Sequence, residues 1–257
     1  MAEVTSLFTP GPLLYAVVVG LVLLAAAVAA LAGLGHGRAA ITAGARAAVQ
    51  LGVVALLISQ VATRLWATVL FVVAMHAVAG YTAASRVGDA SRPGASGAWW
   101  RGRAWWAVLP LLGGTVPVLA LLLGTGLVPP QGLAVIPVAG ILVGGAMTVT
   151  ALCGRRCRDE LETRRGEVEA ALSLGFSDRQ AALEICRPAA ATSLIPALDQ
   201  TRTVGLVTLP GAFVGMLLGG ASPVQAAVVQ LVVLAGLLAV QSVAVALTTE
   251  LSVRAFR

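Results

Sequence analysis

The stretch Leu13–Leu34, LLYAVVVGLVLLAAAVAALAGL, decides the fold class, because it contains no charged side chain. A helix needs about 20 apolar residues to cross the hydrocarbon core of a bilayer. The whole 257-residue chain has the same character, with 58% hydrophobic residues, 11% charged residues and a mean hydropathy of +0.93. Globular domains are about 45–50% apolar and about 25% charged. The composition therefore excludes an ordinary soluble domain, a disordered chain and a coiled coil, and it predicts an all-α polytopic membrane protein.

Six further apolar segments follow the first, so the sequence predicts about seven transmembrane helices in one transmembrane domain, residues 1–257. The six are approximately Ala47–Ala62, Leu65–Ala83, Trp105–Leu123, Leu133–Leu152, Thr203–Leu218 and Val224–Leu247.

Arginine placement predicts the orientation of these spans, because cytoplasmic loops carry an excess of basic residues. All 17 basic residues are arginines. If the spans alternate, the loops after the first, third and fifth spans and the C-terminus share one basic side, while Arg64 lies on the other. Arg38 and Arg46 fall in the first of these loops. We expect the N-terminus outside, the C-terminus in the cytoplasm, and a location in the cell membrane.

The excess of arginines in the predicted cytoplasmic loops accounts for the net charge of +6, so this charge does not indicate a nucleic-acid partner. Four tryptophans lie at the start of the fourth span, where they are expected to anchor the helix at the membrane interface. They are Trp99, Trp100, Trp105 and Trp106.

The segment Cys153–Pro188 differs from the rest of the chain, because it holds seven arginines and seven acidic residues. Its pattern predicts two helices. The first runs from about Arg158 to Leu174 and ends at Gly175, and the second begins at a capping box in which Ser177 is the N-cap and Gln180 is at N3. The second helix is expected to end near Ile185–Arg187, with Pro188 marking the entry to the next apolar region. The three cysteines, Cys153, Cys157 and Cys186, are expected to be reduced thiols.

The spacing inside this segment resembles the EAA loop of ABC-transporter permeases. The matching residues are Glu169, Ala170, Ala171, Gly175, Ile185 and Pro188, and Arg187 stands where that pattern has leucine. The resemblance implies a cytoplasmic coupling helix, in a loop of about residues 153–190, that docks on a separate ATPase subunit. The chain has no lysine and hence no Walker lysine. It is therefore expected to be non-catalytic and to bind no cofactor itself, with ATP and Mg on the partner ATPase.

The second half of the chain resembles the FetB-like iron-export permease family, which also contains plant aluminium-tolerance permeases. The run Val204–Gly211 is the most specific match, and the resemblance is densest over residues 136–230. It implies a permease that pairs with a separate ATPase and exports iron or another metal. We expect the permease to be a homodimer. The chain departs from the family pattern at Gly145, where asparagine is common, and over Ala212–Met216. Three alternatives stay open: an importer with an external binding protein, a nucleotide-sugar permease, and an ATP-independent carrier or channel.

Five residues are candidates for the transport pathway. Asp199 and Arg202 are three residues apart, so on a helix they share a face and can form an ion pair. This pair either lines the transport pathway or lies at the membrane interface as a structural ion pair. Pro210 and Gly211 interrupt the sixth span, because proline removes a backbone donor. The break either marks a substrate site, as in other transporters with broken helices, or is a kink that serves helix packing. Gln50 lies near the start of the second span.

Four residues are candidate metal ligands, since imidazole and thioether groups bind soft transition metals. They are His76, Met75, Met147 and Met216. Each has an alternative role in packing, and a single intramembrane histidine also serves as a hydrogen-bond partner for a neighbouring helix.

Overall fold

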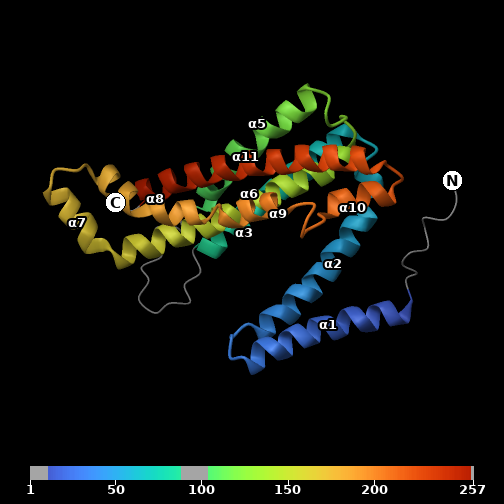
Figure 1. Ribbon diagram of the computed structural model, residues 1–257, viewed down its shortest axis with the longest axis horizontal. Helices are drawn as coiled ribbons and strands as arrows, with labels where there is room; N and C mark the ends of the chain where they lie inside the picture. Colours follow the sequence, from blue (N-terminus) through green and yellow to red (C-terminus); the bar gives the residue numbers. More distant parts are fainter. Residues whose placement is uncertain (1–10, 88–103, 256–257) are drawn as a thin grey trace. The chain divides into compact units, whose positions relative to one another are not determined.

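Helices make up the regular secondary structure of the residues that the computed structural model describes, 11–87 and 104–255 (Figure 1). The all-helical prediction is therefore confirmed. The chain divides into two units, residues 1–63 and residues 64–257, which are described separately below. The assignment of the whole chain to one transmembrane domain stays a prediction. Trp99 and Trp100 lie outside the described residues.

The first unit is a helical hairpin of α1 (Pro12–Leu31) and α2 (Gly37–Val61). The helices pack closely at Gly44, where a Cβ atom would lie 2.9 Å from the methyl groups of Val22. The structure corrects one expectation, because α2 begins ten residues earlier than predicted and Arg38 and Arg46 lie on it instead of in a loop. The alanine-rich sequence between these arginines favours the helix.

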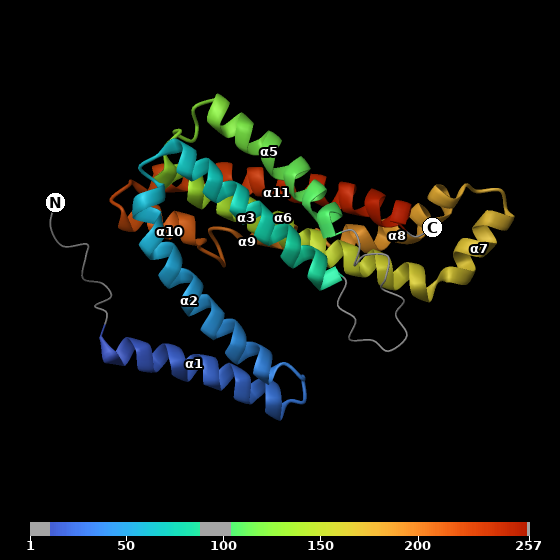
Figure 2. The same cartoon turned by 180° about the vertical axis from the view of Figure 1, so that it is seen from behind.

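The second unit is built around α6 (Gly132–Thr163) and α11 (Pro223–Ala255), which lie side by side along most of their length (Figures 1 and 2). α3 (Leu65–Val87) packs on α6, and α5 (Val108–Gly124) packs on α11. A short 3-10 turn, η1 (Ala104–Ala107), precedes α5. Small residues allow close approach of these helices, as expected for packing in lipid. A Cβ on Gly114 would lie 2.7 Å from the carbonyl oxygen of Val240.

Among the described residues, five helices are long and apolar enough to cross a membrane: α1, α2, α3, α6 and α11. α5 is a shorter apolar helix of 17 residues. α6 and α11 have 32 and 33 residues, or about 48 Å each at 1.5 Å per residue. They exceed the hydrocarbon core of about 30 Å, so each extends beyond it into a polar environment.

The predicted sixth span, Thr203–Leu218, is not one continuous helix. α9 (Ile195–Thr203) ends where that span was expected to begin, and α10 (Gly211–Leu218) has only eight residues. An eight-residue helix is about 12 Å long and cannot cross a bilayer. Gly205 has a φ of +82°, and Pro210 has no N–H group, so the residues between α9 and α10 cannot continue the helical hydrogen bonding.

The charged segment contains one more helix break than predicted. α6 continues to Thr163, the chain breaks at Arg164, and α7 (Arg165–Ser173) follows. The predicted helix from Arg158 to Leu174 is therefore two helices. α8 (Asp178–Thr192) starts where predicted but runs past Pro188. Proline here lacks one helical hydrogen bond, and the buried face of α8 on both sides of it offsets that loss.

Candidate functional site

The turn between α7 and α8 is held by two backbone motifs. Gly175 has a φ of +90°, a conformation that favours glycine. The N–H of Phe176 donates to the carbonyl of Ala171 at 3.2 Å, and the N–H of Gly175 donates to that of Leu172 at 3.0 Å, which together make a Schellman cap. Ser177 and Gln180 form the predicted capping box at the start of α8. The sequence therefore specifies a sharp, pre-organised turn.

This turn, which we call the tip, consists of residues 169–177 and exposes apolar side chains. Leu174 is 79% exposed, and Leu172 and Phe176 are also exposed. Ala170 adds a small exposed side chain beside them. Such a group of large apolar side chains on a charged segment is a feature of protein interaction sites.

Ion pairs surround the tip. Nε of Arg165 lies 3.4 Å from the carboxylate of Glu169, and Arg164 binds Glu167 with a shortest N–O distance of 2.5 Å. The bond to Arg164 holds the pKa of the Glu167 carboxyl below its ordinary range. Glu169 is exposed and has this one ion pair within its own helix, so its carboxylate is accessible to a second basic group.

α8 ties the tip to the long helices. Its buried face packs against α6 and α11 and includes Ile185. At its start, the guanidinium of Arg179 donates two hydrogen bonds of 2.8 Å to the carboxylate of Glu250 on α11. This pairing raises the pKa of Arg179. A charged and an apolar contact therefore join α8, which follows the tip, to α11.

The predicted coupling residues divide into two groups. Glu169, Ala170, Ala171 and Gly175 lie together at the tip. Ile185 lies on the buried face of α8 and Pro188 on its exposed face, so both are on the helix that follows the tip and not at the tip itself. The three cysteines are buried where α6 meets α8 and are free thiols, with 3.8 Å between the sulfurs of Cys153 and Cys157.

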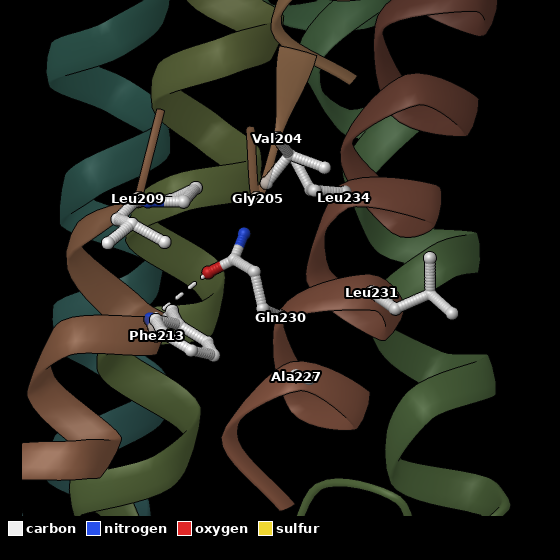
Figure 3. Close-up of a pocket in the computed structure, with 9 residues that line it drawn as sticks. Val204, Gly205, Leu209, Phe213, Ala227, Gln230, Leu231 and Leu234 are labelled. Atoms are coloured by element: carbon white, nitrogen blue, oxygen red, sulfur yellow. Dashed lines mark hydrogen bonds between the residues drawn. The ribbon is translucent and has the colours of Figure 1, made fainter. Parts of the chain in front are cut away.

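A second feature is a cavity of about 410 Å³ beside the broken sixth segment (Figure 3). It lies between the turn after α9, the start of α10 and one face of α11. Gln230 of α11 lies at its centre, and its Oε1 accepts a hydrogen bond of 3.2 Å from the N–H of Phe213. The amide nitrogen of Gln230 points toward Val204 and Gly205 (Figure 3). The cavity wall is otherwise apolar and includes Pro210.

The other pathway candidates are dispersed. Asp199 and Arg202 form the expected pair, with 3.6 Å between Oδ1 and Nη1, on the exposed face of α9. Gly211 begins α10 and faces open space. Gln50 is exposed on α2, in the first unit.

The four candidate metal ligands do not form one cluster. His76 is buried, its Nδ1 donates to the carbonyl of Val72 at 2.8 Å, and its Nε2 lies 2.7 Å from the hydroxyl of Thr115. Met75 points at Gly140, with 3.2 Å between its methyl carbon and the Cβ position of that glycine. Met147 packs against the core, and Met216 is half-buried on α10. Within residues 11–87 and 104–255, no three His, Cys, Asp or Glu side chains are arranged to hold a metal ion.

Several buried polar residues were not among the predicted site residues, and Gln230 and Gln241 are two of them. Gln241 lies on α11 and is 7% exposed. It is eleven residues after Gln230, which is three helical turns and the same face of the helix. That spacing between two amides in an apolar helix is the signal by which it could have been found.

Comparison with known proteins identifies relatives over most of the chain. The model of an uncharacterised protein family, UPF0014, matches residues 13–256. The UPF0014 membrane protein STAR2 of Oryza sativa subsp. japonica is 37% identical over 214 residues, which cover 82% of this chain and 72% of STAR2. The protein ALUMINUM SENSITIVE 3 of Arabidopsis thaliana is 41% identical over 160 residues, or 62% of this chain and 55% of that protein.

A bacterial relative, the probable iron export permease protein FetB of Escherichia coli, is 33% identical over 138 residues. The match covers 54% of this chain and 53% of FetB, so the chain spans about half the length of FetB and of ALUMINUM SENSITIVE 3. No solved structure matches the chain.

Proposed function

Because the chain belongs to the UPF0014 family of membrane proteins, we propose that it is the membrane-spanning permease subunit of an ABC transporter. A separate ATPase subunit hydrolyses ATP, and this chain carries the solute path. The observation that carries the proposal is the tip between α7 and α8, where exposed leucines and a phenylalanine are surrounded by charges. A docking helix needs such a surface, since the apolar centre of an interface supplies its affinity and the charged rim its specificity.

The fold offers a route from the tip to the membrane. When ATP binding draws two ATPase subunits together, the tip moves with its ATPase. α8 passes the motion to α11 through Arg179 and Glu250, and it continues directly into α9, which leads to the broken sixth segment. The tip and the end of α11 lie at the same end of the second unit, which supports a common cytoplasmic side for both (Figure 1).

The proposed solute is iron or another metal, moved outward. This part rests on the names of two relatives, the probable iron export permease protein FetB and ALUMINUM SENSITIVE 3. A homodimer is the proposed assembly. The open space at Gly211 and Gly215 of α10 supports it, because small residues on an uncovered helix face allow a second helix to approach.

Co-purification with the cognate ATPase tests the proposal. Leu174→Ser removes the most exposed apolar side chain of the tip and is expected to reduce ATPase retention at least tenfold. Leu127→Ser is the matched control, because Leu127 is 61% exposed in the loop between α5 and α6, on the opposite predicted side of the membrane. It is expected to leave retention unchanged.

A second pair of variants tests the charge at the tip. Glu169→Arg reverses the accessible charge, and Arg165→Glu breaks the same intrahelical ion pair from the other side. If the ATPase binds the Glu169 carboxylate, only Glu169→Arg lowers retention strongly. Normal retention in both Leu174→Ser and Glu169→Arg, or the absence of any bound ATPase, would refute the docking role and favour an ATP-independent carrier.

A further inference from the structure

The cavity beside the broken sixth segment contains a buried amide whose N–H donors face its interior (Figure 3). Gln230 is 5% exposed, and its Oε1 accepts the hydrogen bond from the N–H of Phe213. That bond fixes the orientation of the amide, so Nε2 is the end that points into the cavity. Nε2 donates to none of the described wall residues, and it keeps accessible surface, so an occupant can reach it. Because buried polar groups ordinarily have partners, the free donor indicates an occupant with an acceptor oxygen.

The rest of the cavity wall suits hydrocarbon. Gln230 is the one polar side chain among the described residues that line the cavity. The turn after α9 does not require a polar neighbour, because the N–H groups of residues 205–208 donate to the carbonyls of Thr203 and Thr208 within the turn. The described wall has no ionisable side chain to bind a metal ion or an anion. Its volume of about 410 Å³ lies within the range of ligand pockets, about 300–1,000 Å³.

The cavity opens toward the lipid side of the second unit. Leu209 and Leu231 line it and are exposed, and the neighbouring Leu206 and Val207 are exposed as well. A group of exposed apolar side chains on a membrane-spanning unit is a surface for contact with acyl chains. A molecule dissolved in the bilayer can therefore enter the cavity from the side.

The homodimer contact proposed for α10 does not cover this opening. Phe213 lines the cavity and is two residues from Gly211 and two from Gly215. Two residues correspond to about 200° around an α-helix. The cavity and the face with the two glycines are therefore on opposite sides of α10.

Gln230 lies at the depth of lipid ester groups. The apolar part of α11 ends at Leu247, before Thr248 and Glu250. A hydrocarbon core of about 30 Å spans about 20 residues of helix, so its other edge falls near Val228. Gln230 is two residues further in, which is about 3 Å below that edge. The ester carbonyls of bilayer lipids lie at this boundary between the hydrocarbon and the headgroups.

We infer that the cavity binds one acyl chain of a bilayer lipid, whose ester carbonyl accepts a hydrogen bond from Nε2 of Gln230. The acyl chain contacts the apolar wall, and the carbonyl satisfies the free donor. Because this lipid contacts the turn after α9, the start of α10 and α11, it supports the broken segment against the long helix. The site requires that the chain cross a membrane, but it does not require an ATPase.

Photocrosslinking of the full chain tests this site. The probe is a phosphatidylcholine with ester-linked chains and a diazirine close to one ester, mixed into phosphatidylcholine nanodiscs. Mass spectrometry of the irradiated chain should locate the label at residues 204–213 and 227–234. We expect at least fivefold more label there than on α1, whose exposed apolar residues report ordinary lipid contact.

A pair of substitutions on α11 tests whether the label reports the cavity. Ala227→Phe fills the cavity from its wall and leaves the bond between Gln230 and Phe213 in place. It should lower the label at residues 204–213 at least fivefold. Val228→Phe is the matched control, because Val228 is exposed on α11 outside the described wall, and it should leave the label unchanged.

Competition by unlabelled lipid in mixed micelles tests the role of the carbonyl. Ester-linked dipalmitoyl phosphatidylcholine should displace the probe at a mole fraction at least threefold lower than its ether-linked dihexadecyl analogue, which has no carbonyl to accept the hydrogen bond. Gln230→Leu should abolish this preference, because leucine has no donor. Gln131→Leu, at an exposed glutamine outside the described wall, should retain it.

Four results would overturn the inference: equal label on α1 and on the cavity residues, unchanged label in Ala227→Phe, equal competition by the ester and ether lipids, or an ester preference that survives Gln230→Leu. Removal of the label by aqueous Fe(II) would assign the cavity to a transported solute and would overturn it too. These measurements use no ATPase, so a failure of the ABC proposal leaves their outcome unaffected.

Discussion

Replacing Gln241 by leucine should raise the Tm, whereas replacing Gln230, on the same face of α11, by leucine should lower it. Gln241→Leu removes a buried oxygen that has no partner among the described residues. A buried acceptor without a hydrogen bond costs about 1–3 kcal/mol, and leucine fills a similar volume. For a chain of about 250 residues, 1 kcal/mol shifts the Tm by about 2–4 °C. Gln241→Leu is therefore expected to raise the Tm by about 2–12 °C.

Gln230→Leu removes a satisfied oxygen, which accepts a hydrogen bond from the N–H of Phe213 near the start of α10. The substitution leaves that N–H without this partner, and the loss of about 1 kcal/mol should lower the Tm by about 2–4 °C. Both variants are measured by thermal denaturation in the same detergent, followed by tryptophan fluorescence, with Gln131→Leu as the reference. If Gln241→Leu lowers the Tm as Gln230→Leu does, the Gln241 oxygen is satisfied in the folded protein and the reasoning is refuted.

Three further predictions concern the tip and the metal candidates. Gly175→Ala forces a non-glycine residue into a left-handed backbone conformation, which costs about 1–2 kcal/mol, and it should weaken ATPase retention. The control is Gly166→Ala in α7, where φ is not positive and the space is open, and it should leave retention unchanged. Because Arg164 lowers the pKa of Glu167, their bond stabilises α7 above the ordinary carboxyl pKa and is lost as the pH falls through the lowered value. Circular dichroism between pH 7 and 3 should show an acid loss of helix that Glu167→Gln lacks, and identical curves would contradict it. Thr115→Val leaves Nε2 of His76 without its hydroxyl partner and should lower the Tm by a few degrees. Iron-stimulated ATP hydrolysis should not change. Loss of the iron response would instead assign His76 to metal binding.

The sequence predicted well those features that depend on local chemistry. The capping box at Ser177 and the left-handed turn at Gly175 follow from side chains and backbone within a few residues, and both are confirmed. The ion pair of Asp199 with Arg202 follows from helical spacing. Helix ends were less predictable. α8 continues past Pro188 because buried contacts with α6 and α11 outweigh one missing hydrogen bond, and those contacts come from residues far away in the sequence.

The candidate site was predicted in part for the same reason. A family pattern marked the residues of the tip together with Ile185 and Pro188, and the structure places Ile185 on the buried face of α8. His76 was recognised as unusual from its position in an apolar run. Its partner Thr115 lies 39 residues later, on another helix, and no local pattern connects them.

The amino-acid sequence by itself determined that this chain is a multi-pass helical membrane protein with one dense charged segment, because hydropathy and charge are sums over neighbouring residues. Only the tertiary structure decided which buried polar groups of the membrane helices have partners from other helices. Gln230 and Gln241 are both glutamines on the same face of α11. The side-chain oxygen of Gln230 accepts a hydrogen bond from α10, whereas that of Gln241 accepts none from the described residues. That difference depends on the placement of α9 and α10 against α11, which arises from packing between segments that are distant in sequence.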